Sequence, residues 1–273
     1  MGTLQRALLL STGISPHLEA LVMRGGRLGV AEMPAHVGVL VHSEQGVVLF
    51  DTGFAPRLRR AVRPFPDLLY PVLVPWRDGR SAVSQLPDYG ICAREVRHVF
   101  VSHLHPDHVA GLRDFPNATF HLSPEAWLAL RDARGLARVV AAWMPQLLPE
   151  DFGARVRWID RFTGPALGAF PATCDLFGDG TLRAVPLPGH APGQLGLLAD
   201  GGDKGRLLFA ADAAWLSRAV RERRSPSRLS DRLTWSPAAR DLTLERLNKL
   251  WWEDADTRIL LTHCPEHRVG ELW

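Results

Sequence analysis

The chain of 273 residues is 46% hydrophobic and 22% charged, an ordinary globular composition that argues against a disordered chain, a collagen-like repeat or a disulfide scaffold. Its 32 lysines and arginines nearly balance its 29 aspartates and glutamates, so the net charge of +3 gives no reason to expect a nucleic-acid partner. No apolar run is long enough to span a membrane and no signal-peptide pattern is evident, so we expect a cytoplasmic protein without a membrane partner.

The first half of the chain alternates short apolar strands with turns. Strands are predicted at residues 37–42, 47–50, 95–101 and 118–122. The first two form a hairpin, and the second of them ends at the polar Asp51, which suggests the edge of a site. A helix is predicted from Pro124 through Leu130, because Ser123 suits the N-cap position and proline suits the first turn.

Residues 54–76 form a long, apolar segment interrupted by prolines. Three interpretations fit this composition: a wall for an acyl chain, an arm that joins two copies in a homodimer, or a loop that packs on its own core. The sequence does not choose among them.

The second half of the chain repeats the pattern of the first. Strands are predicted at residues 181–187, 195–198, 206–211 and 258–262, and a helix that opens at Ser236-Pro237 carries Leu242, Leu247, Leu250 and Trp251 near helical spacing. Strand pairs followed by helices, twice over, predict two packed sheets with helices outside, which is a four-layer αβ/βα sandwich of the α/β class. Since no linker separates the halves, we expect a single domain over residues 1–273.

Side chains suited to metal binding follow the ends of four predicted strands. His103, His105, Asp107 and His108 lie within six residues directly after strand 95–101, and His190, Asp212 and His263 hold similar positions in the second half. A single histidine at a strand end is more often a hydrogen-bonded or surface residue. This density of ligand types and their repeated placement predict a site for two metal ions.

These motifs resemble, in order and spacing, those of the metallo-β-lactamase-fold hydrolases, and the resemblance covers nearly the whole chain. It implies that one ion is bound by His103, His105 and His190, the other by Asp107, His108 and His263, and that Asp212 bridges them. Asp51 is implied to orient the ligand loop rather than to bind metal. Imidazole and carboxylate ligands suit two Zn²⁺ ions best, and also tolerate iron, manganese or cobalt.

Within this fold the sequence looks most like the N-acyl-homoserine-lactone lactonases. Zinc lactamases that cleave antibiotics typically carry cysteine where Asp212 stands, and diiron reductases carry glutamate where His105 stands. The resemblance implies that a hydroxide shared by two metals opens a lactone ring, that Asp107 or Asp212 handles the proton, and that the protein quenches quorum signals. Many such lactonases have tyrosine three residues after the bridging aspartate, where this chain has Trp215; its only tyrosines, Tyr70 and Tyr89, lie elsewhere in the sequence.

Other functions use the same metal chemistry. A thioesterase or another ester hydrolase is the first alternative, since the same hydroxide attacks any activated acyl group. A phosphodiesterase depends on the basic segment after Asp212, which is otherwise a solvated loop and contains Arg218, Arg221, Arg223, Arg224, Arg228 and Arg232. A metal-binding regulatory protein with weak catalysis is the third. In every catalytic case the partner is a small-molecule acyl or phosphoryl substrate.

The remaining histidines and the cysteines are predicted to be structural. His36 and His267 are the two that would border the pocket, and the other structural or surface histidines are His17, His42, His98 and His121. The three cysteines, Cys92, Cys174 and Cys264, form no C-x-x-C pair, and we expect buried thiols in a reducing compartment.

Overall fold

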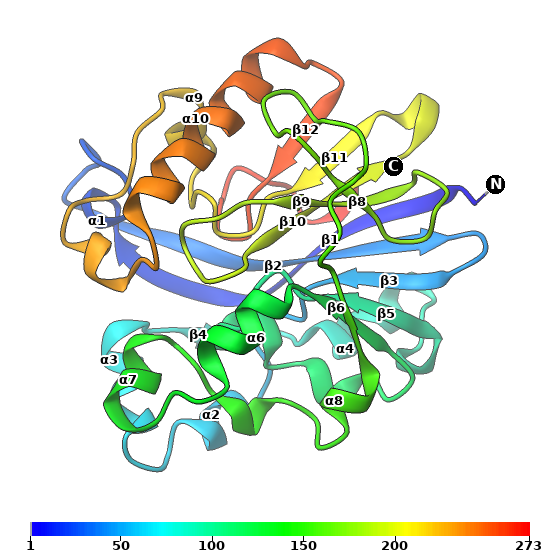
Figure 1. The fold of residues 1–273 in the computed structure, drawn as a ribbon. Helices are drawn as coiled ribbons and strands as arrows, with labels where there is room; N and C mark the ends of the chain where they lie inside the picture. Colours follow the sequence, from blue (N-terminus) through cyan, green and yellow to red (C-terminus); the bar gives the residue numbers. More distant parts are fainter. Residues whose placement is uncertain (1) are drawn as a thin grey trace.

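The computed structural model describes residues 2–273 as two β-sheets packed face to face, with helices on both outer sides (Figure 1). The larger sheet has the strand order β13-β1-β2-β3-β5-β6-β7, with β4 paired to β1, and the smaller has the order β12-β11-β10-β9-β8. The predicted four-layer arrangement is therefore confirmed.

The elements of the two sheets follow each other along the chain. The larger sheet contains β1 (Leu4–Leu18), β2 (Val30–His42), β3 (Gly46–Phe50), β4 (Arg77–Asp78), β5 (Val96–Phe100), β6 (Thr119–Leu122), β7 (Val156–Trp158) and β13 (Gly270–Glu271). The smaller sheet contains β8 (Cys174–Asp175), β9 (Leu182–Pro186), β10 (Leu195–Asp200), β11 (Arg206–Phe209) and β12 (Thr257–Leu260). The helices are α1 (Glu19–Val22), α2 (Leu58–Ala61), α3 (Tyr70–Leu73), α4 (Ala82–Gln85), α5 (Pro106–Val109), α6 (Pro124–Leu130), α7 (Gly135–Val140), α8 (Phe152–Arg155), α9 (Ser217–Arg221) and α10 (Pro237–Glu253).

Alternating side chains of the central strands fill two different cores. In β3, Val47 and Leu49 pack with the helices outside the larger sheet, whereas Val48 and Phe50 pack against the smaller sheet. This alternation follows from the two-residue period of a strand. A third core lies between the outer face of the smaller sheet and α10. Three cores between four layers explain why the strands read as nearly continuous apolar runs.

The longest strand, β1, is missing from the sequence-based prediction. It pairs antiparallel with β2 along most of its length, with an irregularity between Ser11 and Ile14. Ala7 and Leu9 face one core and Leu8 and Leu10 the other. Because both faces are buried, the run has no polar alternation that would have marked it as a strand.

The long helix α10 begins where the sequence predicts. The Ser236 hydroxyl accepts the Ala239 N–H at 3.4 Å, and Pro237 occupies the first turn. The predicted apolar stripe is wrong at Leu242, which is 49% exposed; Leu244 is buried in its place beside Leu247. Leu242 lies five residues before Leu247, which turns it roughly 140° around the helix axis.

Among the described residues, no helix has the length and apolar character that crossing a membrane requires.

The cysteines only partly fulfil the prediction of buried thiols. Cys264 is buried, and its sulfur accepts the Ser217 N–H at 3.2 Å, whereas Cys174 is half-buried and Cys92 is exposed. Burial raises the pKa of the Cys264 thiol, which keeps it protonated and structural.

Two histidines of the larger sheet are expected to make the stability of the folded protein sensitive to acid. His98 Nδ1 lies 3.0 Å from His121 Nε2, and burial lowers the pKa of His98 to about 4 and that of His121 to about 3. Both rings are neutral in the folded protein and bind protons on unfolding at pH values below about 6.5. The free energy of unfolding is therefore expected to fall as the pH drops from about 6.5 towards 4, by at most about 1.4 kcal/mol per pH unit for His121.

Urea denaturation at a series of pH values measures this effect. His121→Asn removes one of the two titrating rings, so its stability is expected to fall less steeply over the same range. Equal slopes in the variant and the parent would contradict a buried, neutral His121.

Candidate metal centre

Four of the predicted ligands lie directly after β5. His103 and His105 stand two residues apart, and His105 is the N-cap residue of α5, with extended backbone. Pro106 occupies the first position of α5, where its missing N–H costs nothing and its fixed φ favours the helix. Asp107 and His108 follow within the first turn, so the strand end and the helix start present both pairs to the same space.

The other three ligands come from the smaller sheet. His190 lies on the loop after β9, Asp212 follows β11 and His263 follows β12. Because β11 and β12 are parallel neighbours, their carboxyl ends meet at one edge. Gly189, at φ +137°, brings the His190 loop so close to α10 that a Cβ there would lie 2.2 Å from the Arg240 nitrogen.

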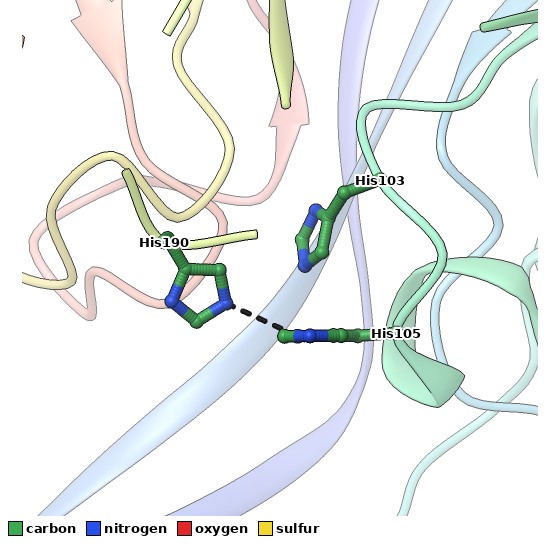
Figure 2. A group of neighbouring side chains, drawn as sticks. All are labelled: His103, His105 and His190. Carbon is green, nitrogen blue, oxygen red and sulfur yellow. Dashed lines mark hydrogen bonds between the residues drawn. The ribbon is translucent and has the colours of Figure 1, made fainter. Parts of the chain in front are cut away.

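Three histidines form one group of ligand atoms. His103, His105 and His190 point towards a common centre in Figure 2, and their ligand nitrogens lie within 4.8 Å of one another. Two of these atoms, His190 Nε2 and His105 Nδ1, lie 3.1 Å apart. Two of these residues come from the larger sheet's loop and one from the smaller sheet.

A second group lies beside the first. Asp107, His108 and His263 also offer ligand atoms within 4.8 Å of one another. Asp212 stands between the groups: its Oδ1 lies 3.3 Å from His108 Nε2, and its Oδ2 lies 3.4 Å from His190 Nε2 and 3.2 Å from His263 Nε2. The structure thus brings all seven predicted ligands together.

Hydrogen bonds to the far side of each ring fix which nitrogen faces the centre. Asp51 accepts hydrogen bonds from His108 Nδ1 at 2.7 Å, from the Ser102 hydroxyl at 2.7 Å and from the Ser102 N–H at 2.8 Å. Because the Ser102 hydroxyl donates to Asp51, it accepts from His103 Nδ1 at 2.9 Å. His263 Nδ1 donates to the Pro34 carbonyl at 2.7 Å. His103, His108 and His263 therefore turn Nε2 towards the centre. Partners such as Asp51, Ser102 and the Pro34 carbonyl commonly orient metal-binding histidines in this way.

Buried atoms without partners test whether these residues suit metal ions. His103 Nε2 is enclosed and has no hydrogen-bond partner among residues 2–273. His108 Nε2 and Asp212 Oδ1 are also enclosed, and although they lie 3.3 Å apart they are not aligned as a hydrogen bond. A buried polar atom without a partner costs about 1–3 kcal/mol. A divalent ion would satisfy these lone pairs, so the residues fit the two implied ions.

At neutral pH three of the candidate ligand rings are neutral, whereas those of His108 and His263 carry a proton. Burial lowers the pKa of His103 and His190, and that of His105 to about 3, which leaves neutral rings. For Asp212, burial opposes ionisation, but His263 and His108 hold its pKa well below the usual range. The pKa of His263 is about 10, because the charges of Asp212 and Asp107 outweigh burial. An ion bound at His263 would therefore displace a proton.

A mostly apolar pocket opens above these ligands. His105, Asp107, His190, Asp212 and His263 line one side. The apolar lining consists of Leu21, Val22, Met33, Leu73, Val74, Val139, Val140, Ala142 and Leu233. No arginine is among the described residues that line it, and Arg218, Arg221 and Arg224 instead pair with Glu19, Glu266 and Glu222.

The histidines at the pocket differ from those expected, and Tyr70 reaches it as part of the segment 54–76. Tyr70 and His17 both line the pocket, whereas His36 and His267, the two histidines expected there, do not. The segment 54–76 supplies Tyr70, Leu73 and Val74 to the pocket, and Tyr70 also packs in the core, so the segment is a pocket wall that packs on its own core. Only the three-dimensional path of the chain brings these side chains to the ligands.

Trp215 contacts the central carboxylate directly. Its Nε1 donates a hydrogen bond to Asp212 Oδ2 at 3.0 Å, and its ring meets His190 edge-on with centroids 5.7 Å apart. Trp215→Phe keeps the ring and removes the donor. We expect metal affinity to fall about tenfold, measured by competition with a chelator.

Trp252→Phe is the matched control, because the Trp252 Nε1 also donates a hydrogen bond, to the Arg221 carbonyl, but on the exposed surface. Unchanged affinity in the Trp215 variant would mean that this bond does not orient Asp212.

Known proteins resemble this chain in sequence and in fold. The model of the metallo-beta-lactamase superfamily matches residues 32–263. An N-acyl homoserine lactonase AttM of Azorhizobium caulinodans is 32% identical over 159 residues, which are 55% of this chain and 52% of that protein, so the match spans about half of the relative. The probable metallo-hydrolase Rv2300c of Mycobacterium tuberculosis is 27% identical over 225 residues, or 74% of this chain and 66% of that protein. A solved N-acyl homoserine lactone hydrolase with the product N-hexanoyl-L-homoserine at its catalytic metal centre has a TM-score of 0.71 at 16% identity, with 98% of each chain covered.

Proposed function

This chain belongs to the metallo-beta-lactamase superfamily, and from that membership we propose that it is a metal-dependent hydrolase that opens the ring of an acylated lactone. The observation that carries the proposal is the convergence of five histidines and two aspartates at one side of a mostly apolar pocket. The names of the AttM relative and of the lactone hydrolase structure support the choice of a lactone. Quorum quenching is the corresponding biological role.

The proposed ligand sets follow the two groups of side chains. His103, His105 and His190 would hold one ion, and Asp107, His108 and His263 the other, with Asp212 bridging. Two divalent ions, most simply Zn²⁺, supply an activated hydroxide and polarise an ester carbonyl when bound.

The chain's own carboxylates would handle the proton. Asp107 and Asp212 both line the pocket, and histidine charges lower the pKa of each although burial opposes this. Each is therefore ionised at neutral pH and can accept a proton from the attacking water. Asp212 Oδ2 accepts a hydrogen bond from Trp215 Nε1, and Asp107 Oδ2 lies 3.2 Å from His263 Nε2, so both carboxylates are held in place.

The apolar wall supports an acyl substituent on the substrate. Leu21 and Val22 of α1, Leu73 of α3 and Val139 and Val140 of α7 face the same pocket as the ligands. Burying an acyl chain against them contributes about 0.8 kcal/mol for each methylene group. None of the six arginines that a phosphodiesterase would use, all among the described residues, lines the pocket, and Arg218, Arg221 and Arg224 are paired with glutamates, so no observation favours that alternative.

Hydrolysis of an N-acyl-homoserine lactone series, followed with a pH indicator beside matched acyl thioesters, tests the proposal. The protein's metal content is determined by elemental analysis on the same sample. We expect preferential lactone opening at two ions per chain. Faster cleavage of the thioesters would assign a thioesterase, and no turnover at full metal loading would assign a non-catalytic metal-binding protein.

A further inference from the structure

Some polar side chains line the pocket without being proposed ligands, and their hydrogen bonds decide which of them can act on a substrate. They are Ser15, His17, Tyr70, Trp215 and Ser230. A side chain whose donor already has a partner is not free to donate to a bound molecule.

Ser15 and His17 form a short chain of hydrogen bonds. The Ser15 hydroxyl donates to the Pro75 carbonyl at 2.7 Å, and its oxygen lies 3.0 Å from His17 Nε2. Because the single Ser15 proton is engaged, His17 Nε2 must be the donor to Ser15. The pKa of His17 is lowered, mainly by burial, so the neutral ring has no second N–H to offer.

Two further donors are engaged as well. The Ser230 hydroxyl donates to the Leu21 carbonyl at 2.8 Å, and Trp215 Nε1 donates to Asp212. Among the non-ligand side chains that line the pocket in the described chain, Tyr70 alone is left with a free donor.

The Tyr70 hydroxyl opens onto this pocket. The residue is only 1% exposed, and its hydroxyl has no hydrogen-bond partner among residues 2–273. The hydroxyl oxygen is nevertheless not fully enclosed, unlike the unpaired His103 Nε2. Since the side chain lines the pocket, that opening faces the space above the ligands. Tyr70 begins α3, and its ring packs against Trp76 with centroids 6.2 Å apart, which holds the phenol in place.

Burial, followed by the charges of Asp107 and Asp212, raises the pKa of Tyr70 well above its ordinary value. The phenol therefore keeps its proton at neutral and moderately alkaline pH, and it is a hydrogen-bond donor rather than a base.

On the basis of the lactonase function proposed above, we propose that the Tyr70 hydroxyl donates a hydrogen bond to the ring oxygen of the lactone while the bond between the acyl carbon and that oxygen breaks. The hydroxide part of a water molecule adds to the acyl carbon, and the breaking bond leaves its electron pair on the ring oxygen. Asp107 or Asp212 accepts the second proton of the water and returns it to that oxygen, which becomes the product hydroxyl. Until that proton arrives, the Tyr70 hydroxyl stabilises the negative charge on the ring oxygen, and Tyr70 is itself unchanged at the end of the reaction.

The proposed role assigns Tyr70 to the leaving oxygen because it is a donor from the start of the reaction. Asp107 and Asp212 are ionised and accept hydrogen bonds only, until one of them takes the proton of the attacking water. A donor aimed at an oxygen that gains charge in the transition state accelerates that step by about 10²-fold or more.

Tyr70→Phe tests the proposal on two substrates that differ in one atom: an N-acyl-homoserine lactone and the thiolactone with the same ring size and acyl chain. Sulfur is a weak hydrogen-bond acceptor and a better leaving group. We expect kcat for the lactone to fall about 10²-fold, and kcat for the thiolactone to fall less than about threefold. Metal content and melting temperature are expected to stay unchanged. Tyr89→Phe, at the other tyrosine of the chain, is the control and should leave both rates as they are.

An equal loss on both substrates, or no loss on the lactone, would overturn the assignment. A wild-type protein that opens no lactone would instead refute the proposed function, and this outcome is seen before any variant is made.

A second variant keeps every ring in place. Because the chain has two tyrosines, growth of Tyr89→Phe on 3-fluorotyrosine labels Tyr70 alone. Fluorine makes the phenol a stronger hydrogen-bond donor, so kcat for the lactone at neutral pH should rise while kcat for the thiolactone stays the same. Equal changes on both substrates, or no change on the lactone, would contradict a donating Tyr70.

Discussion

Replacing His105 with alanine is expected to remove metal and hydrolysis together. The variant loses one nitrogen of the group formed with His103 and His190, whose ligand atoms lie within 4.8 Å of one another. Two histidines cannot hold an ion as three do, so elemental analysis should find about one ion fewer per chain. Lactone hydrolysis should fall by at least about 10³-fold.

Stability supplies the second measurement for this variant. Ions that bind the folded protein raise its melting temperature by mass action. The difference between metal-loaded and chelator-treated protein is therefore expected to shrink in His105→Ala. His98→Ala removes a histidine outside the site and should keep both the ions and the activity. Full activity in the His105 variant would refute the proposed ligand set.

Asp51→Asn is expected to weaken metal binding by about 10- to 100-fold without removing any ligand. Asp51 is fully buried, and its carboxylate accepts hydrogen bonds from His108 and from the N–H and the hydroxyl of Ser102. The Ser102 hydroxyl in turn accepts a hydrogen bond from His103. An asparagine side chain has one acceptor oxygen and one NH₂ group, so at least one of these three donors would face another donor. An NH₂ group in place of Oδ2 would face His108 Nδ1 and the Ser102 hydroxyl that holds His103, and one in place of Oδ1 would face the Ser102 N–H directly before His103. Asparagine tolerates the positive φ of 58° at this position, so the backbone should not change.

Chelator competition measures this affinity, and Asp179→Asn is the matched control. Asp179 also accepts a hydrogen bond from a buried histidine, at 2.9 Å from His42 Nε2, but lies outside the metal centre. If the two variants lost the same affinity, a general loss of stability rather than ligand orientation would be the cause.

The candidate ligands could be picked out from the sequence because each follows an apolar strand that ends at the same edge of its sheet. The strands after which His103, Asp212 and His263 stand have strong apolar runs, and strand ends in packed sheets are where polar side chains gather. The fold followed from the same runs, because buried strands and capped helices such as the one at Ser236 have local signals. Asp51 could be recognised for the same reason, as a polar residue that directly follows β3.

The pocket beyond the ligands had no such local signal. Tyr70 reaches it because the segment after β3 folds back over the larger sheet through α2 and α3, and no periodic pattern in residues 54–76 marks that path. His17 lies at the end of β1, a strand that both cores cover and that therefore shows no alternation. The position of a side chain that depends on the path of the chain far from it in sequence can be seen only in the three-dimensional structure.

The division of the ligands between two sheets gives the ions a mechanical role. Residues 103–108 belong to the larger sheet and His190, Asp212 and His263 to loops of the smaller one, so bound ions would act as a clasp across one edge of the sandwich. Removing them leaves the core between the sheets intact but frees the strand ends at that edge. Amide hydrogens near the ends of β5, β11 and β12 should then exchange with solvent faster, while those in the centre of β2 and β3 keep their protection.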